Sequence, residues 1–141
     1  MREGWHHDEY LILFSEVEAA RATAAYDIAE SLDGFTVIGL HGWDDFIVRD
    51  RSGAIFTVPT VPAIPRYLTS ATFAVEGIDV DSDPDLQGRI KWYVKPVVFG
   101  GDPSAEENLI WITHEQHIEL VKWWNRKYRD VTAGIQEHDS H

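Results

Sequence analysis

The fold is decided by residues 46–58, which read FIVRDRSGAIFTV. Two runs rich in β-branched and aromatic side chains flank the turn Asp50-Arg51-Ser52-Gly53, which has Asp first and Gly fourth. That order of residues is typical of a type I turn. Two such runs around one turn predict a β-hairpin, with strands at 46–49 and 54–58.

Further strands are predicted on both sides of this hairpin. Residues 10–14 and 35–40 precede it as short runs with aromatic and β-branched members. Residues 90–95 follow it and alternate in side-chain type, and residues 108–112 form another short run. The intervening segment 58–65 holds three prolines, which lack a backbone donor, so we expect an extended connection there.

Two capping boxes predict two helices. Ser15 and Thr113 each stand three residues before a Glu or Gln that can close the box. We expect the first helix to run to about Ser31 and the second to about Asp130. The residues expected on the inward faces are Val17, Ala20, Ala24 and Ile28 in the first helix and His117, Leu120, Val121, Trp124 and Tyr128 in the second.

These elements predict one α+β domain, in which a mixed, mainly antiparallel sheet packs against an N-terminal and a C-terminal helix. The 141 residues suffice for a single core. We place the domain at residues 1–131 and expect residues 132–141 to form a polar C-terminal tail. The chain has no cysteine, no apolar run long enough for a membrane span and no apolar signal region at its start, so we expect a cytoplasmic protein.

The charge balance indicates which class of partner the protein can bind. Twenty-four acidic residues against twelve basic ones give a formal net charge of −12. Nucleic acids and anionic membranes require clustered Lys and Arg, so neither is expected as a partner. A basic protein would instead be attracted by this charge. An acidic surface without any electrostatic partner is the alternative, because many cytoplasmic proteins are acidic.

The acids are concentrated in residues 76–85, here called the acidic segment, which contain no basic residue. The first three acids after Gly77 alternate like the opening ligands of an EF-hand calcium loop. Pro84 stands where that loop needs Gly, and Ile90 stands where it needs a bidentate Glu, so no calcium site is expected. The residues that we predict to bind a partner are Glu76, Asp79, Asp81, Asp83 and Asp85.

Two other groups of residues bear on catalysis or metal binding. His114 and His117 are three residues apart, whereas the zinc-protease helix needs a spacing of four, and no third ligand is identifiable. Asp44 and Asp45 are adjacent at the start of a strand, where neighbours point to opposite faces unless a bulge intervenes. We therefore expect no metal, no cofactor and no assembled catalytic set.

Several segments together resemble one known family. The segments are Leu32–Gly39, Asp45–Val48, Gly53, Ile55–Pro59, Phe99–Pro103, Asn108–His117 and Trp123–Asn125. In their order and local sequence they are similar to the SMI1/KNR4, or SUKH, superfamily over roughly residues 16–130. Asp33 stands where that family usually has proline, and Gly42-Trp43-Asp44 replaces a Gly-rich run that often precedes its central strands.

The resemblance implies a sheet packed against helices and no fixed set of catalytic residues, so none is carried over. Bacterial members commonly act as immunity proteins that neutralise toxins, many of them nucleases, whereas fungal members are linked to cell-wall signalling. We therefore expect a non-enzymatic protein that blocks a basic toxin by occlusion. The alternatives are a small hydrolase or metal-dependent enzyme that uses Asp44, Asp45 and a histidine such as His41, and a housekeeping adaptor of the same fold.

Overall fold

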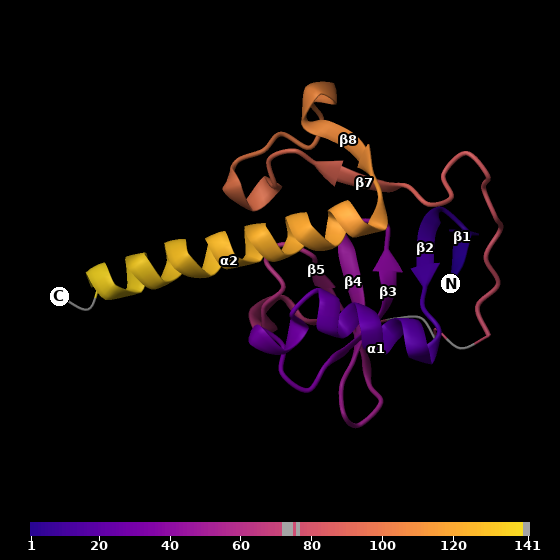
Figure 1. Cartoon of the computed structure of the whole chain (residues 1–141), viewed down its shortest axis with the longest axis horizontal. Coiled ribbons are helices and arrows are strands. Elements are labelled where there is room, and N and C mark those ends of the chain that lie inside the picture. The colour runs from indigo at the N-terminus through magenta and orange to yellow at the C-terminus, as the bar shows by residue number, and fades with distance from the viewer. Residues whose placement is uncertain (72–74, 76, 140–141) are drawn as a thin grey trace.

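The predicted hairpin forms and belongs to an antiparallel sheet of six strands, in the order β1-β2-β3-β4-β5-β6. The computed structural model describes residues 1–71, 75 and 77–139. Every described strand pair is antiparallel, which confirms the α+β class with a mainly antiparallel sheet (Figure 1). The strands are β1 Arg2–His6, β2 Glu9–Leu13, β3 Thr36–His41, β4 Asp45–Arg49, β5 Ile55–Pro59 and β6 Thr69–Ser70.

The first helix is shorter than predicted. α1 spans Glu16–Ala25 and begins with the expected capping box of Ser15 and Glu18. It stops before Ser31 because Asp27 adopts a left-handed conformation, with φ 55°, and a short 3-10 helix, η1 (Ile28–Glu30), follows. A left-handed residue cannot continue a right-handed helix.

The predicted inward face of the first helix is wrong for three of its four residues, whereas the fourth, Ile28, is buried as predicted and lies in η1. Ala19 and Ala22 are buried, whereas Val17 is 61% exposed and Ala20 and Ala24 are exposed as well. Alanine occurs at both the buried and the exposed positions, so the sequence pattern could not distinguish the two faces of the helix. Alanine at the buried positions lets α1 pack closely against β3.

The second helix is longer than predicted. α2 spans His114–Asp139, so the segment after residue 131 continues as helix through residue 139. The predicted capping box is present: the Thr113 hydroxyl accepts from the Gln116 backbone, and the Gln116 side chain accepts from the Thr113 backbone. The predicted inward residues of α2 are buried or half-buried, as expected.

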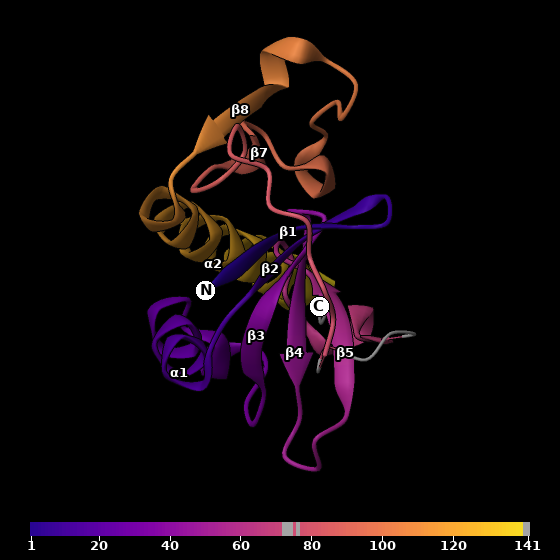
Figure 2. The same cartoon turned by 90° about the vertical axis from the view of Figure 1, so that its right-hand side faces the viewer.

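Both helices pack on one face of the sheet (Figure 2). The alternating strand residues Tyr10, Phe46 and Val58 face them. On the opposite face, Leu11 and Ile47 form a second apolar cluster with Ile78, in the chain that follows β6. This chain crosses that face and leads up to a separate two-stranded sheet.

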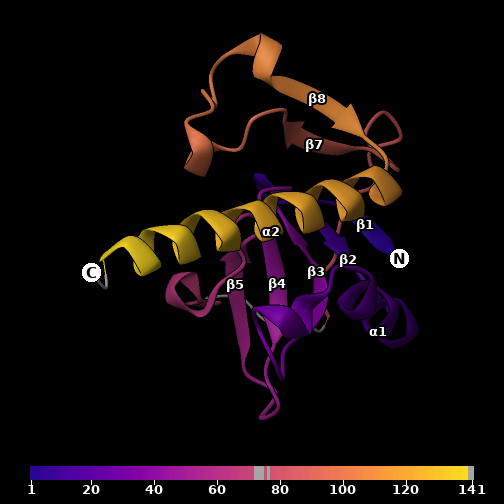
Figure 3. The same ribbon diagram turned by 60° about the vertical axis from the view of Figure 1, so that its left-hand side comes forward.

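The small sheet lies at one end of the main sheet, beside the start of α2 (Figure 3). It consists of β7 (Ile90–Tyr93) and β8 (Leu109–Ile112), and both were predicted from their sequences. Three further 3-10 helices occur, namely η2 Pro65–Tyr67, η3 Val97–Phe99 and η4 Glu106–Asn108. Ile90, Trp92 and Ile112 join the main core, so both sheets share one apolar interior.

Candidate functional site

The turn between β3 and β4 places a tryptophan in an unusual backbone conformation. Gly42 and Trp43 have φ values of 60° and 65°, which are left-handed. This conformation suits Gly but is strained for a bulky residue, at a cost of about 1–3 kcal/mol. The Trp43 ring stacks on Tyr10, with centroids 4.8 Å apart, and meets the edges of Trp5 and Trp111. These aromatic contacts hold the turn in its strained form.

The strained turn forms one side of a pocket of about 240 Å³. Three aromatic residues, Trp43, Trp92 and Tyr93, are among those that line it, and so are Asp44 and Asp45. The remaining lining residues are Pro59, Thr60, Val61, Pro96 and Val97. The pocket therefore lies between the end of the main sheet and the small sheet, and it combines aromatic walls with two acidic groups.

Burial raises the pKa of both acids. For Asp44 the removal of water is the largest cause, the neighbouring Asp45 adds to the rise, and Lys91 opposes it. For Asp45 burial again dominates, and His41 opposes it. Neither carboxylate forms a salt bridge with any residue in the described part of the chain. Burial thus disfavours the ionised form of both side chains, and a cation bound beside them would favour it.

Asp44 and Asp45 are both among the residues that line one pocket, and the prediction that their side chains point to opposite faces stays a prediction. Asp44 belongs to the turn rather than to β4, so the alternation of a strand does not apply to it. His41 was expected beside them. It is the partner of Asp45 in the pairing of β3 with β4, but its Nε2 lies 2.7 Å from the Glu9 carboxylate and it is not among the residues that line the pocket.

Helix α2 holds the floor of the pocket through Asn125. The Asn125 side chain donates to the Thr60 carbonyl oxygen at 2.8 Å and accepts from the Ala63 backbone at 2.9 Å. Thr60 in turn donates its backbone N–H and its hydroxyl to the Asp44 carbonyl oxygen. One continuous set of hydrogen bonds thus connects α2 to the acidic turn.

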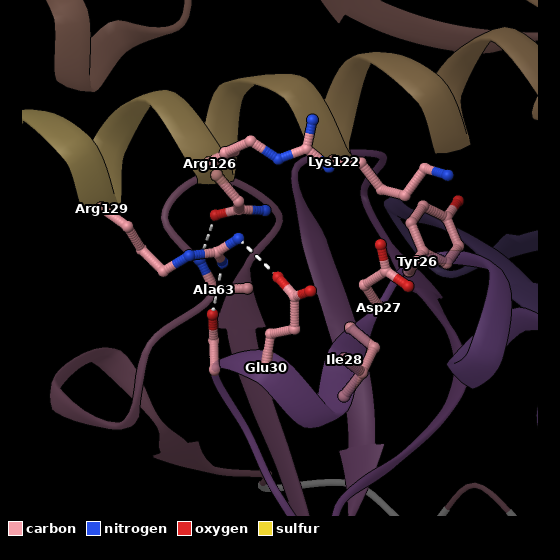
Figure 4. Close-up of a pocket in the computed structure, with 10 residues that line it drawn as sticks. Tyr26, Asp27, Ile28, Glu30, Ala63, Lys122, Arg126 and Arg129 are labelled. Atoms are coloured by element: carbon pink, nitrogen blue, oxygen red, sulfur yellow. Dashed lines mark hydrogen bonds and ion pairs between the residues drawn. The ribbon is translucent and has the colours of Figure 1, made fainter.

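A second set of polar contacts fixes α2 against η1 (Figure 4). Arg129 donates to the Glu30 carboxylate at 2.6 Å and to the Ser31 hydroxyl at 2.9 Å. The cavity beside these groups measures only about 10 Å³, which is at the lower limit of about 10–15 Å³ needed to hold one water molecule. The contacts therefore have a structural role.

Exposed apolar side chains gather on the small sheet and the loop that follows β7. We call this the β7–β8 surface, and its members are Val94, Val97, Val98, Ile110 and Trp111. Trp111 is 45% exposed although its ring contacts Trp43. Trp123 on α2 is also exposed, at 54%, so one of the two adjacent tryptophans does leave the inward stripe. Clustered exposed apolar residues mark interaction sites more often than isolated ones.

The acidic segment lies against β1. Asp81 forms a β-bridge with Trp5, and the Asp83 carboxylate accepts from the Trp5 indole at 3.1 Å. Asp79, Asp81 and Asp85 are exposed, whereas Asp83 is half-buried. The expected turn after Asp83 is present. Of the five predicted partner-binding residues, Glu76 lies outside the described residues. The other four lie in the chain beside β1.

Two histidines at the start of α2 lie beside a buried tyrosine. Tyr26 hydroxyl lies 2.6 Å from His117 Nδ1 and 3.1 Å from His114 Nε2. Burial lowers the pKa of His117 to about 3, with a smaller contribution from His114, and burial also lowers the pKa of His114. No group of three or more metal-ligating side chains is found in the described part of the chain.

No known family, curated protein or solved structure matches the chain. The likeness to the SMI1/KNR4 superfamily therefore stays a prediction. None of the described helices is both long enough and apolar enough to cross a membrane.

Sequence reasoning missed the pocket as a unit. Trp43, Trp92 and Tyr93 are aromatic residues of the kind that fill cores, and no local pattern shows that they converge. The one available signal was Gly42-Trp43-Asp44, a turn sequence with an unexpected Trp beside two acids. A bulky residue in a tight turn is uncommon and indicates a constraint beyond the turn itself.

Proposed function

We propose that this chain is a non-enzymatic protein-binding domain of the immunity type, which neutralises a basic toxin by covering its active surface. The observation that carries the proposal is the β7–β8 surface, a set of exposed apolar side chains that includes Trp111, whose ring contacts Trp43. Protein interfaces commonly combine an apolar centre that includes Trp with a polar rim. The likeness to the SMI1/KNR4 superfamily supports the same reading.

The acids supply the second part of the proposal. Asp79, Asp81 and Asp85 project from the chain that leads into β7, and Asp44 and Asp45 lie beside Trp43, which contacts Trp111. A basic nuclease binds phosphates through Lys and Arg. Carboxylates held at these positions would occupy the same cations and speed the encounter at low salt.

The first test uses the protein encoded next to this chain, because immunity genes sit beside their toxins. We expect co-expression to relieve its toxicity and the purified proteins to form a complex that weakens with added salt. Failure of the neighbouring protein to bind, or toxicity that persists on co-expression, would refute the immunity function.

The second test asks whether the acidic segment binds the partner, or whether only the overall negative charge of the protein matters. Replacing Asp79, Asp81 and Asp85 by Asn is expected to weaken binding and flatten its salt dependence. A control with the same charge change replaces the exposed Asp33 and Asp130 by Asn and Glu119 by Gln. Equal effects of the two variants would show that the acidic segment has no special place in the interface.

The third test addresses the apolar surface. Trp111→Ala is expected to weaken binding by at least about tenfold, since a Trp near an interface centre contributes about 2 kcal/mol or more. Trp123→Ala is the matched control, because Trp123 is also about half exposed but lies on α2. If Trp123→Ala has the larger effect, the partner binds α2 instead.

A small acid/base hydrolase is a second candidate, and the raised pKa values of Asp44 and Asp45 in one pocket favour it. A buried carboxyl group with a raised pKa can act as a general acid while a second carboxylate activates water. Chromogenic esters and glycosides test this. Turnover that is lost in both Asp44→Asn and Asp45→Asn would support a hydrolase, and absence of turnover by the unmodified protein would exclude it for these substrates.

A further inference from the structure

The aromatic and acidic pocket has features that select one kind of ligand. Its volume of about 240 Å³ lies below the range of about 300–1,000 Å³ that is common for drug-sized ligands. It is therefore suited to a single side chain or a small head group. A large cofactor or an extended sugar chain would not be enclosed.

The charges of the pocket favour a cation. Asp44 and Asp45 both line it, and neither is paired in a salt bridge within the described residues. The opposing charges come from Lys91, which acts on Asp44, and from His41, which acts on Asp45. His41 Nε2 also lies 2.7 Å from the Glu9 carboxylate. A bound cation would complete the neutralisation of the two carboxylates.

The walls of the pocket favour a flat cation. Trp43, Trp92 and Tyr93 are among its lining residues, and Tyr93 lies close enough to Asp44 for that charge to act on its hydroxyl. A guanidinium group is planar, stacks on aromatic faces and donates two parallel hydrogen bonds to a carboxylate. An ammonium group is a compact point charge and gains less from such walls.

We propose that this pocket binds the guanidinium group of an arginine side chain that the partner protein presents. The arginine would stack between the aromatic walls while its N–H groups donate to Asp44 and Asp45. This inference rests on the proposed protein-binding function. It adds a specific anchor, one arginine inserted between the main sheet and the small sheet, next to Trp111.

The backbone around the pocket is prepared for such a ligand. The Asp44 carbonyl oxygen is held by two donors from Thr60, and Thr60 is held by Asn125 of α2. The turn is fixed on its other side by the stacked rings of Trp43 and Tyr10. The backbone that carries Asp44 is therefore fixed before the ligand arrives, which lowers the ordering cost of binding.

The experiment titrates the protein with Nα-acetyl-arginine amide and follows the indole N–H resonances by NMR. Acetyl-lysine amide and acetyl-citrulline amide are the comparison ligands, because the first keeps the charge and the second keeps the shape without the charge. We expect shifts at Trp43 and Trp92 and an affinity for the arginine derivative at least about tenfold above citrulline. Equal affinity for citrulline or lysine would overturn the guanidinium assignment, as would absence of binding.

A variant makes the same test at the pocket itself. Asp45→Asn is expected to weaken binding of the arginine derivative by about tenfold or more. Asp33→Asn is the control, since it removes one charge from an exposed position before β3. An equal loss of affinity in both variants would show that the arginine derivative does not bind in this pocket. The comparison of ligands on the unmodified protein remains decisive if Asp45→Asn does not fold.

Two further outcomes separate this inference from the proposed function. If the neighbouring toxin binds but the arginine derivative does not compete with it, the pocket inference fails and the protein-binding function stands. If the arginine derivative binds but the toxin does not, the guanidinium site stands and the immunity function fails. Tighter binding of free arginine than of the capped derivative would identify a metabolite, rather than a partner protein, as the source of the guanidinium group.

Discussion

His117 is expected to make the protein acid-labile over a defined range of pH. The side chain is 0% exposed, and its pKa in the folded protein is lowered from 6.5 to about 3, mainly by burial. The unfolded chain therefore takes up a proton at this residue between these two values, whereas the folded protein does not. Stability is fully present above pH 6.5 and is lost as the pH falls toward about 3.

The size of the loss follows from the two pKa values. Each pH unit within the window is worth about 1.4 kcal/mol for one proton, so the contribution falls by about 2 kcal/mol at about pH 5 and about 3 kcal/mol at about pH 4. His117→Asn removes the titrating group but keeps an oxygen that can accept from the Tyr26 hydroxyl. The variant is expected to be less stable at neutral pH, because a buried ring is lost.

Urea titrations at about pH 7.5 and about pH 5 measure this difference. The free energy of unfolding of the unmodified protein, relative to the variant, is expected to fall by about 2 kcal/mol between the two conditions. His7→Asn is the control, because His7 is exposed in the β1–β2 turn and Asn tolerates its left-handed φ of 56°. A difference that does not change with pH, or that changes equally for His7→Asn, would refute the reasoning.

Three further changes test the packing around the site. Gly4→Ala is expected to cost about 1–3 kcal/mol in urea unfolding, because its Cβ would overlap the Asp81 carbonyl oxygen, and an unchanged midpoint would contradict this. Asp45→Asn is expected to raise the melting temperature near neutral pH, because burial raises the pKa of Asp45 and its ionised form is disfavoured in the folded protein. The gain should vanish at acid pH, where the carboxyl is protonated in both states, and a gain that persists there would count against this origin. Asn125→Ala is expected to cost about 1–3 kcal/mol and to speed hydrogen exchange of the Ala63 amide, whose acceptor is removed; unaltered exchange would rule out the positioning role.

Local chemistry in the sequence predicted much of the fold. The β4–β5 hairpin could be predicted because its turn residues and flanking strands agree. Both capping boxes formed because they depend only on residues three apart. The early end of α1 at Ala25 could not be predicted in this way, because a left-handed Asp27 is imposed by the packing of Tyr26 and Ile28 into the core.

The strand β1 and the pocket show what local patterns leave out. Arg2–His6 has no regular alternation of apolar residues, and the strand is held by its pairing with β2 and by Asp81, which is distant in sequence. The pocket joins the β3–β4 turn, the end of β5 and β7, and no spacing rule connects these three parts of the chain. The acidic segment could be located from composition, whereas the position of Asp44 and Asp45 in one cavity required the tertiary structure.

The bridge between Trp5 and Asp81 also bears on self-association. β1 is the first strand of the sheet, and an open outer edge there could pair with the same edge of another copy. The Trp5 backbone instead exchanges two hydrogen bonds with Asp81, at 2.7 and 2.8 Å. A second copy would have to displace this chain and bring like charges together. The acidic segment thus has a second effect besides the proposed attraction of a basic partner: its carboxylates oppose edge-to-edge aggregation of the sheet.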